Sequence, residues 1–262
     1  MSLKEITSVD NPQVKLLKKL QLKKYRDSEN LFAVENLKTI LDAVSANKIF
    51  SELFITSDLW QKNKTILEKF KDTAEIYLIP EKVNKIFSTL DNPSGITALY
   101  KKTVNKEVNF DFTLPVVYLN GVADPGNVGT ILRSAVDFGF QQVVADEKTA
   151  DFYGPKTISA AKDAIFKLNL LQVSDFTFLE NYKKDHGNIY ASSLEGGKNL
   201  KEIKFAKNYC LVFGSEGQGV SPEIKKIATE LFYIPTTGKI ESLNVATATS
   251  IVFYDLFVRK QI

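Results

Sequence analysis

Residues 120–135 read NGVADPGNVGTILRSA, and they predict an apolar strand, a rigid polar turn and a helix start in close succession. The preceding strand, 114–119, is too apolar for a sheet with one face in water. Residues 124–127 have turn chemistry, because Pro fixes φ, Gly admits positive φ and Asn bonds its own backbone. This order of elements is typical of an α/β fold.

The helix that follows has features of a binding site. Asn127 is expected to be its N-cap, and Gly139 is expected to end it. Free backbone N–H groups at a helix start attract anions, and Arg133 adds a full positive charge one or two turns later. Loops at the carboxyl ends of α/β strands often carry sites, although this turn alone also fits a plain strand-to-helix joint.

The composition bounds the class of protein. The chain has 262 residues, 44% hydrophobic and 25% charged, which is enough for two modest domains or one large one. No apolar run approaches the roughly 18 residues of a membrane span, and the start Met1–Glu5 lacks the apolar core of a secretory signal. The single cysteine, Cys210, excludes an internal disulfide and is expected to be a small buried hydrophobe. We therefore expect a cytoplasmic protein.

The positive charge is concentrated near the N-terminus. Residues 1–105 hold 17 basic and 13 acidic residues, whereas the remainder holds 17 and 18. Most of the excess comes from Lys15, Lys18, Lys19, Lys23, Lys24 and Arg26. Such a cluster suits a phosphate backbone, and a solvated helix face fits the charge equally well.

Both halves of the chain alternate strands with helices. In the first half, residues 1–30 predict one basic amphipathic helix. It is followed by strands at 32–34, 52–56, 76–79 and 95–100 and by helices at 37–46, 58–71 and 84–89. Residues 101–111 are polar and are expected to be a linker. In the second half, we expect strands at 114–119, 142–145, 188–191, 209–213 and 231–234 and helices at 128–138, 158–166, 222–228 and 243–260. This pattern predicts a mostly parallel sheet with helices on both faces.

Two more strand-to-helix loops carry polar groups. Residues 211–222 hold glycines spaced G-x-x-G-x-G, unlike the Rossmann order, together with the carboxylate of Glu216. In residues 233–246, Ser242 is expected to cap the C-terminal helix, and Asn244 keeps an amide near the loop. A flexible connection and a capped core helix are the plainer interpretations of these two loops.

Several familiar chemistries are disfavoured. His186, the only histidine, lies in a polar stretch and is expected to be a loop residue. One His and one Cys argue against a zinc site or a Cys–His nucleophile, and no P-loop sequence is present. The polar candidates that remain are Asn127, Arg133, Glu216, Ser242 and Asn244.

Taken in order, the three loops resemble the signature motifs of the SpoU (TrmH) family of RNA ribose 2′-O-methyltransferases, within the SPOUT superfamily. The matching segments are 120–135, 213–222 and 234–246, inside a similarity that covers roughly 114–260. Residues 32–35 and 92–96 resemble the family's substrate-binding domain, which is similar to a small ribosomal RNA-binding protein. Asn36 stands where that domain usually has Gly, and Thr236-Thr237 stand where the third motif often has an apolar residue.

The resemblance implies an architecture and a reaction. It implies an RNA substrate-binding domain over residues 1–105 and, over 106–262, a doubly wound α/β methyltransferase domain with a deep C-terminal trefoil knot. The methyl donor, S-adenosylmethionine, would contact Gly214, Ile234 and Leu243. The catalytic residues carried over are Arg133, Asn127, Glu216, Ser242 and Asn244. Arg133 would act on the ribose hydroxyl either as a general base or by stabilising its negative charge.

The implied partners are RNA, ribosomal rather than transfer RNA, and a second copy of the chain, with no metal and no membrane. Three alternatives stay open at this point. One is a transfer RNA 2′-O-methyltransferase, another is a non-catalytic RNA-binding protein that keeps the fold, and the last is a small-molecule α/β enzyme that uses the glycine loop for another nucleotide.

Overall fold

The computed structural model describes residues 3–103, 109–239 and 241–260, which fold into two compact units. The first unit comprises Met1–Val104 with Tyr153–Ser159, and the second comprises Asn105–Phe152 with Ala160–Ile262. The division between Val104 and Asn105 falls inside the polar segment 101–111 that was expected to be a linker. Residues 104–108 of this segment are outside the described part of the chain. No helix in the described ranges is long and apolar enough to cross a bilayer.

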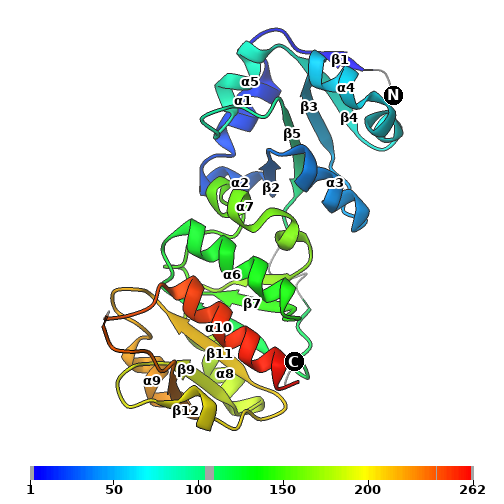
Figure 1. Ribbon diagram of the computed structural model, residues 1–262. Helices are drawn as coiled ribbons and strands as arrows, with labels where there is room; N and C mark the ends of the chain where they lie inside the picture. The colour runs from blue at the N-terminus through cyan, green and yellow to red at the C-terminus, as the bar shows by residue number, and fades with distance from the viewer. Residues whose placement is uncertain (1–2, 104–108, 240, 261–262) are drawn as a thin grey trace. The chain divides into compact units, whose positions relative to one another are not determined.

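The first unit is a mixed sheet of five strands in the order β1-β4-β3-β5-β2 (Figure 1). Its strands are β1 (Lys4–Glu5), β2 (Leu31–Val34), β3 (Glu52–Thr56), β4 (Glu75–Ile79) and β5 (Ile96–Lys101). Its helices are α1 (Pro12–Lys19), α2 (Lys23–Glu29), α3 (Leu37–Ser45), α4 (Ser57–Leu67), continued by a 3-10 turn over Glu68–Phe70, and α5 (Glu81–Phe87). The small α/β layer expected for this half is confirmed.

The single N-terminal helix expected over 1–30 is wrong, because α1 and α2 are separate. Arg26 is 4% exposed, and its guanidinium donates to the carbonyl oxygens of Leu20 at 2.7 Å and Gln21 at 2.8 Å. Leu20 is the C-cap of α1 and Gln21 follows it, so a side chain from α2 caps the end of the first helix. Arg26 is therefore a structural cation, and the exposed basic cluster consists of the five lysines alone.

The second unit is a sheet of seven strands in the order β10-β12-β9-β11-β6-β7-β8, and every pairing between them is parallel. Its strands are β6 (Val116–Asn120), β7 (Gln142–Ala145), β8 (Asn169–Gln172), β9 (Ile189–Ser192), β10 (Lys198–Asn199), β11 (Cys210–Gly214) and β12 (Glu230–Tyr233). Its helices are α6 (Pro125–Asp137), α8 (Thr177–Asp185), α9 (Pro222–Ile227) and α10 (Val245–Val258). A further helix, α7 (Pro155–Ala161), belongs to the first unit up to Ser159 and ends in the second. Short 3-10 helices cover Lys162–Phe166 and Leu200–Glu202.

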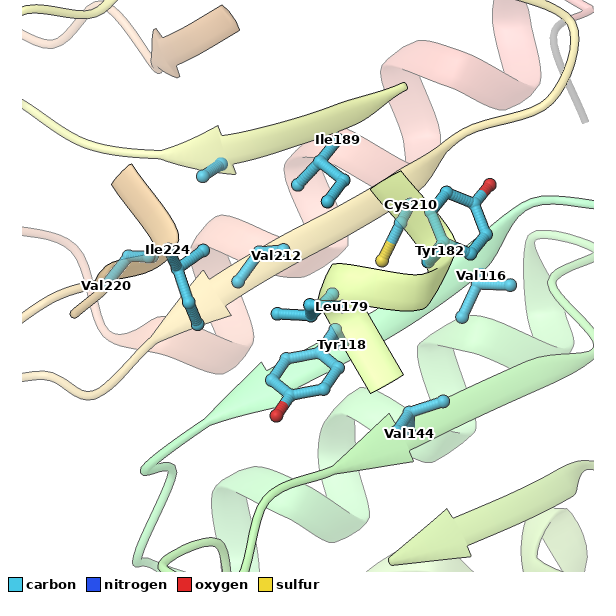
Figure 2. Close-up of a cluster of buried hydrophobic side chains, with 11 residues drawn as sticks. Val116, Tyr118, Val144, Leu179, Tyr182, Ile189, Cys210, Val212, Val220 and Ile224 are labelled. Atoms are coloured by element: carbon cyan, nitrogen blue, oxygen red, sulfur yellow. The ribbon is translucent and has the colours of Figure 1, made fainter. Parts of the chain in front are cut away.

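Helices cover both faces of this sheet, as expected. On one face α6 packs beside α10, and the ring of Phe253 of α10 lies tilted against Phe140 and meets Phe213 of β11 edge-on. On the other face α8 and α9 cover a cluster that includes Cys210 and Val212 of β11 (Figure 2). Successive residues of a strand point to opposite faces, so both faces of β11 are buried, which explains its unbroken apolar sequence.

Two strands and one α-helix of the second unit were not predicted. The strands β8 and β10 lie at the two edges of the sheet and are short, with polar residues at their ends. The helix α8 was also missed, although its Leu179 and Tyr182 are buried in the core cluster. Edge strands and a helix with two buried anchors leave a weak apolar pattern in the sequence.

Candidate active site

The three polar loops lie at one edge of the parallel sheet. The first follows Asn120 at the end of β6, the second follows Gly214 at the end of β11, and the third follows Tyr233 at the end of β12. β11 pairs directly with β6, with Gly214 opposite Asn120, and β9 separates β11 from β12. Parallel strands end at the same edge, so the loops that follow them converge, as ligand-binding loops do in open α/β sheets.

Side chains from the three loops meet in a hydrogen-bonded cluster of Asn127, Glu216 and Asn244, which we call the amide–carboxylate cluster. The Nδ2 of Asn127 donates to the Oε1 of Glu216 at 2.9 Å. The Nδ2 of Asn244 donates to the Oδ1 of Asn127 at 3.0 Å and to the same Glu216 oxygen at 2.5 Å. Residues up to 117 positions apart in the sequence are thus joined by three hydrogen bonds.

The helix caps differ from those expected. Asp124, not Asn127, caps α6, and its Oδ1 accepts from the Asn127 backbone N–H at 2.8 Å. Because Asp124 fills the cap three residues before Asn127, the side-chain amide of Asn127 is available to Glu216. Pro125 at the first helical position is the signal that identifies Asp124 as the cap.

The residue expected to cap α10 is also wrong. Asn244, not Ser242, caps α10, since its Oδ1 accepts from the backbone N–H groups of Ala246 at 3.0 Å and Thr247 at 3.2 Å. Ser242 is exposed and lies outside the helix. One side chain therefore starts α10 with its oxygen and joins the cluster with its nitrogen.

Gly214, the first glycine of the glycine loop, lies so close to the backbone of Gly219 and Val220 that no larger residue fits there. A Cβ added to Gly214 would lie 2.0 Å from the carbonyl carbon of Gly219 and 2.2 Å from the nitrogen of Val220. Gly219 has φ of +64°, a conformation that favours glycine, and its N–H donates to the Ser215 carbonyl at 2.9 Å. The loop is thus a tight turn, with open space beside Gly217 and Gly219.

The remaining expected site residues lie outside the cluster. Arg133 is exposed on α6, and among the described residues its side chain makes no hydrogen bond or ion pair. It follows Asn127 by six residues, which corresponds to about 9 Å along a helix and about 120° around it. Ile234 is half-buried and Leu243 is 37% exposed, so both keep apolar surface at this edge.

Asp146, which was not predicted as a site residue, forms a second polar group at this edge of the sheet. Asp146 directly follows β7, and its carboxylate accepts hydrogen bonds from the Asn120 side chain and the Gly121 N–H. The signal was available, because Asp146 comes after an apolar strand just as the three predicted loops do.

Cys210 and His186, which the sequence disfavours as catalytic or metal-binding residues, pack against apolar or aromatic neighbours. Cys210 is fully buried in the core cluster, and burial raises the pKa of its thiol. His186 ends α8, where its ring stacks on Phe112 with centroids 4.4 Å apart. Within the described ranges, no three His, Cys, Asp or Glu side chains form a group able to hold a metal ion.

Comparison with known proteins identifies the families and relatives that this chain resembles. The model of the SpoU rRNA methylase family matches residues 115–254, and a model described as an MRM3-like substrate-binding domain matches residues 11–98. The chain is 28% identical over 255 residues to a 23S rRNA (guanosine(2553)-2′-O)-methyltransferase, RlmP, of Bacillus subtilis, covering 97% of this chain and 99% of that protein.

Solved structures with a similar fold cover nearly the whole chain. An AdoMet-bound rRNA methyltransferase from Sinorhizobium meliloti superposes with a TM-score of 0.85 at 26% identity, covering 99% of this chain and 98% of that one. A putative RNA methyltransferase of the TrmH family from Porphyromonas gingivalis gives a TM-score of 0.82 at 31% identity, with coverage of 96% and 99%.

The family model matches more than half of the chain, and the chain therefore belongs to the SpoU rRNA methylase family. It is an RNA methyltransferase of that family, as the resemblance of its three loops predicted.

Proposed function

We propose that this protein transfers a methyl group from S-adenosylmethionine to a ribose 2′-hydroxyl of structured RNA, and that the RNA is ribosomal. The observation that carries the proposal is the amide–carboxylate cluster, which joins all three signature loops at the carboxyl edge of the parallel sheet. The Bacillus subtilis relative, a 23S rRNA 2′-O-methyltransferase aligned over nearly all of both chains, supports the choice of RNA.

The residues at this edge fit the methyl donor. Open space beside Gly217 and Gly219 leaves backbone groups of the loop accessible to a ligand. The apolar surfaces of Ile234 and Leu243 suit an adenine ring and the carbon chain of the donor. We propose that Gly214, Ile234 and Leu243 hold S-adenosylmethionine, which supplies a methyl group already activated by a positively charged sulfur.

The chain's own residues then position the ribose and stabilise charge. We assign Arg133 to the developing alkoxide and the neighbouring phosphate, because a guanidinium keeps its positive charge and can stabilise both. Asn127 orients the ribose, while Glu216, Asn244 and Ser242 shape the site around it. With an activated donor, positioning supplies much of the rate.

The residue ranges 1–105 and 106–262 are proposed as the RNA substrate-binding domain and the methyltransferase domain. The match of residues 11–98 to a substrate-binding domain model supports the first assignment. Five exposed lysines around α1 and α2 provide a cationic surface for an RNA backbone: Lys15, Lys18, Lys19, Lys23 and Lys24.

We further propose that the C-terminal segment is threaded into a trefoil knot and that the protein is a cytoplasmic homodimer that needs no metal. The bond between Glu216 and Asn244, which ties the second loop to the third, fits a threaded arrangement. An apolar stripe on α10 supports dimerisation, since Ile251, Tyr254, Phe257 and Val258 are 38%, 58%, 55% and 58% exposed. Contiguous exposed apolar surface of this kind is typical of an interface.

Donor titration and methyl mapping test the proposal. Isothermal titration with S-adenosylmethionine should show binding, and labelled donor should transfer methyl to a ribosomal RNA transcript, at a 2′-hydroxyl located by mapping. Transfer RNA should be a poor acceptor. Absence of donor binding would refute the proposal, whereas donor binding without transfer to ribosomal or transfer RNA would favour a non-catalytic RNA-binding protein.

A further inference from the structure

A hydrogen-bonded bridge at the base of the site ties the first loop to the end of the second. Its anchor is Asp146, whose Oδ1 accepts from the Gly121 N–H at 3.0 Å and from the N–H and Oγ1 of Thr149 at 2.9 and 2.8 Å. Thr149 is 3% exposed, and its hydroxyl oxygen also lies 3.1 Å from the Leu119 carbonyl oxygen. Asp146 is therefore held rigidly beside the end of β6.

Asn120 extends the bridge to the glycine loop. Its Nδ2 donates to the Oδ2 of Asp146 at 2.8 Å, and its Oδ1 accepts from the backbone N–H of Ser221 at 2.8 Å. Ser221 ends the glycine loop and caps α9, so its backbone position determines where that loop finishes. The bridge links two segments that are 101 residues apart in the sequence.

The chemistry of the partners determines which atom of the Asn120 amide donates and which accepts in its two hydrogen bonds. A backbone N–H can only donate, so the oxygen of the Asn120 amide must face Ser221. The nitrogen of that amide must then face Asp146, which as a carboxylate can only accept. An asparagine between a fixed acceptor and a fixed donor satisfies both partners in one orientation only.

We infer that Asp146 and Asn120 are a positioning pair that sets the spacing between the first loop and the glycine loop, so that Asn127 meets Glu216. The inference rests on the proposed function, because it assigns to the pair an effect on methyl transfer. Neither residue touches the amide–carboxylate cluster directly: Asn120 acts through the loop that leads to α6 and through Ser221.

Exchanging the two side chains tests the pair. In Asp146→Asn an amide nitrogen faces the Asn120 nitrogen, and in Asn120→Asp two carboxylates face each other, so each single variant breaks the bridge. The double variant Asp146→Asn with Asn120→Asp restores it, because the new asparagine donates to the new carboxylate, which accepts from Ser221. Glu147→Gln, an exposed neighbour, is the matched control.

We expect each single variant to lower kcat at least tenfold with KM for RNA changed less than threefold, and the double variant to recover to within threefold of the wild-type kcat. Asn120→Ala, which removes both links without creating a repulsive contact, should behave like the single exchanges and keeps the test valid if one of them fails to fold. Full activity in the folded single variants, or a double variant no better than they are, would overturn the inference.

Amide hydrogen exchange separates this inference from the proposed function. Repulsion between the like groups at positions 120 and 146 pushes both side chains away from their backbone partners. The Ser221 and Gly121 amides should therefore exchange at least tenfold faster in the single variants than in the wild type and regain protection in the double variant. Unchanged protection would overturn the positioning pair whatever the activity. A wild-type protein that transfers no methyl would instead refute the proposed function, and the exchange measurement would still report on the bridge.

Discussion

The side chain of Asn244 uses both ends of its amide in opposite directions. Its oxygen accepts from two backbone N–H groups at the start of α10, and its nitrogen donates to Asn127 and Glu216. The sequence identified all three cluster residues as candidates, but it gave the capping role to Ser242. Capping preferences of Ser and Asn are similar, so local sequence could not separate the two positions.

An Asn244→Asp variant separates capping from the cluster. Asp caps a helix as well as Asn, so the free energy of unfolding should change by no more than about 0.5 kcal/mol. A carboxylate in place of the amide nitrogen would face Glu216, and methyl transfer should fall at least tenfold. Urea unfolding and a transfer assay measure the two effects. Asn244→Ala should in addition lose about 1 kcal/mol of stability, whereas Ser242→Ala should lose none.

The role of Arg133 is open to a kinetic test. Arg133→Ala should lower kcat at least a hundredfold and leave the dissociation constant for S-adenosylmethionine within twofold, because the side chain is exposed and makes no bond within the described residues. Arg133→Lys should keep partial activity with an unchanged pH profile if the charge alone matters. A rise in kcat towards pH 10, near the ordinary pKa of lysine, would instead identify a general base.

At the scale of secondary structure, the N-terminal region shows how one side chain changes an element. The apolar spacing predicted one helix over residues 1–30, but the chain forms α1 over Pro12–Lys19 and α2 over Lys23–Glu29, and Arg26 of α2 turns back onto the carbonyls of Leu20 and Gln21 between them. Propensity and periodicity do not record such a contact, because lysine and arginine are equally acceptable on an exposed helix face.

The exposed lysines around this break are expected to bind RNA. Replacing Lys18 and Lys23 with Ala should raise KM for RNA at least fivefold and reduce the salt slope of binding by about 1 to 2, since each phosphate contact contributes about 0.7–0.9. Replacing Lys62 and Lys69, which are equally exposed, removes the same charge and should have little effect. Equal losses in the two double variants would argue for a general charge effect.

The glycine loop gives a second prediction at this scale. Gly214→Ala would force backbone atoms apart, because the added Cβ would lie 2.0 Å from Gly219. We expect a loss of about 1–3 kcal/mol in unfolding free energy and at least a tenfold weaker affinity for the donor. Gly217→Ala, whose Cβ would meet nothing within 4 Å, should leave both quantities unchanged. Thermal unfolding and donor titration measure them.

For the whole molecule, the exposed stripe on α10 predicts assembly. The ring of Phe138 packs against Tyr254 and Phe257, so the stripe continues onto the end of α6. Tyr254→Asp should convert a dimer into a folded monomer in sedimentation velocity, because it places a charge in the apolar contact. Leu194→Asp, at a separate position that is 64% exposed, should leave the dimer intact. A wild-type monomer would refute the dimer.

The sequence by itself determined the class of fold and the polar candidates of the site. Continuous apolar runs predicted buried parallel strands, and the three loops were located because each follows a strand. These features are local, and the chemistry of neighbouring residues is enough to produce them.

Only the tertiary structure decided which of these residues meet. The order of the strands brings β6 beside β11, and hydrogen bonds then form between residues 89, 117 and 28 positions apart. The same pairing, together with that of β7 beside β6, unites Asp146, Asn120 and Ser221, a bridge that no single loop of the sequence suggests. Long-range contacts of this kind depend on strand order and packing across the whole sheet, which local patterns do not encode.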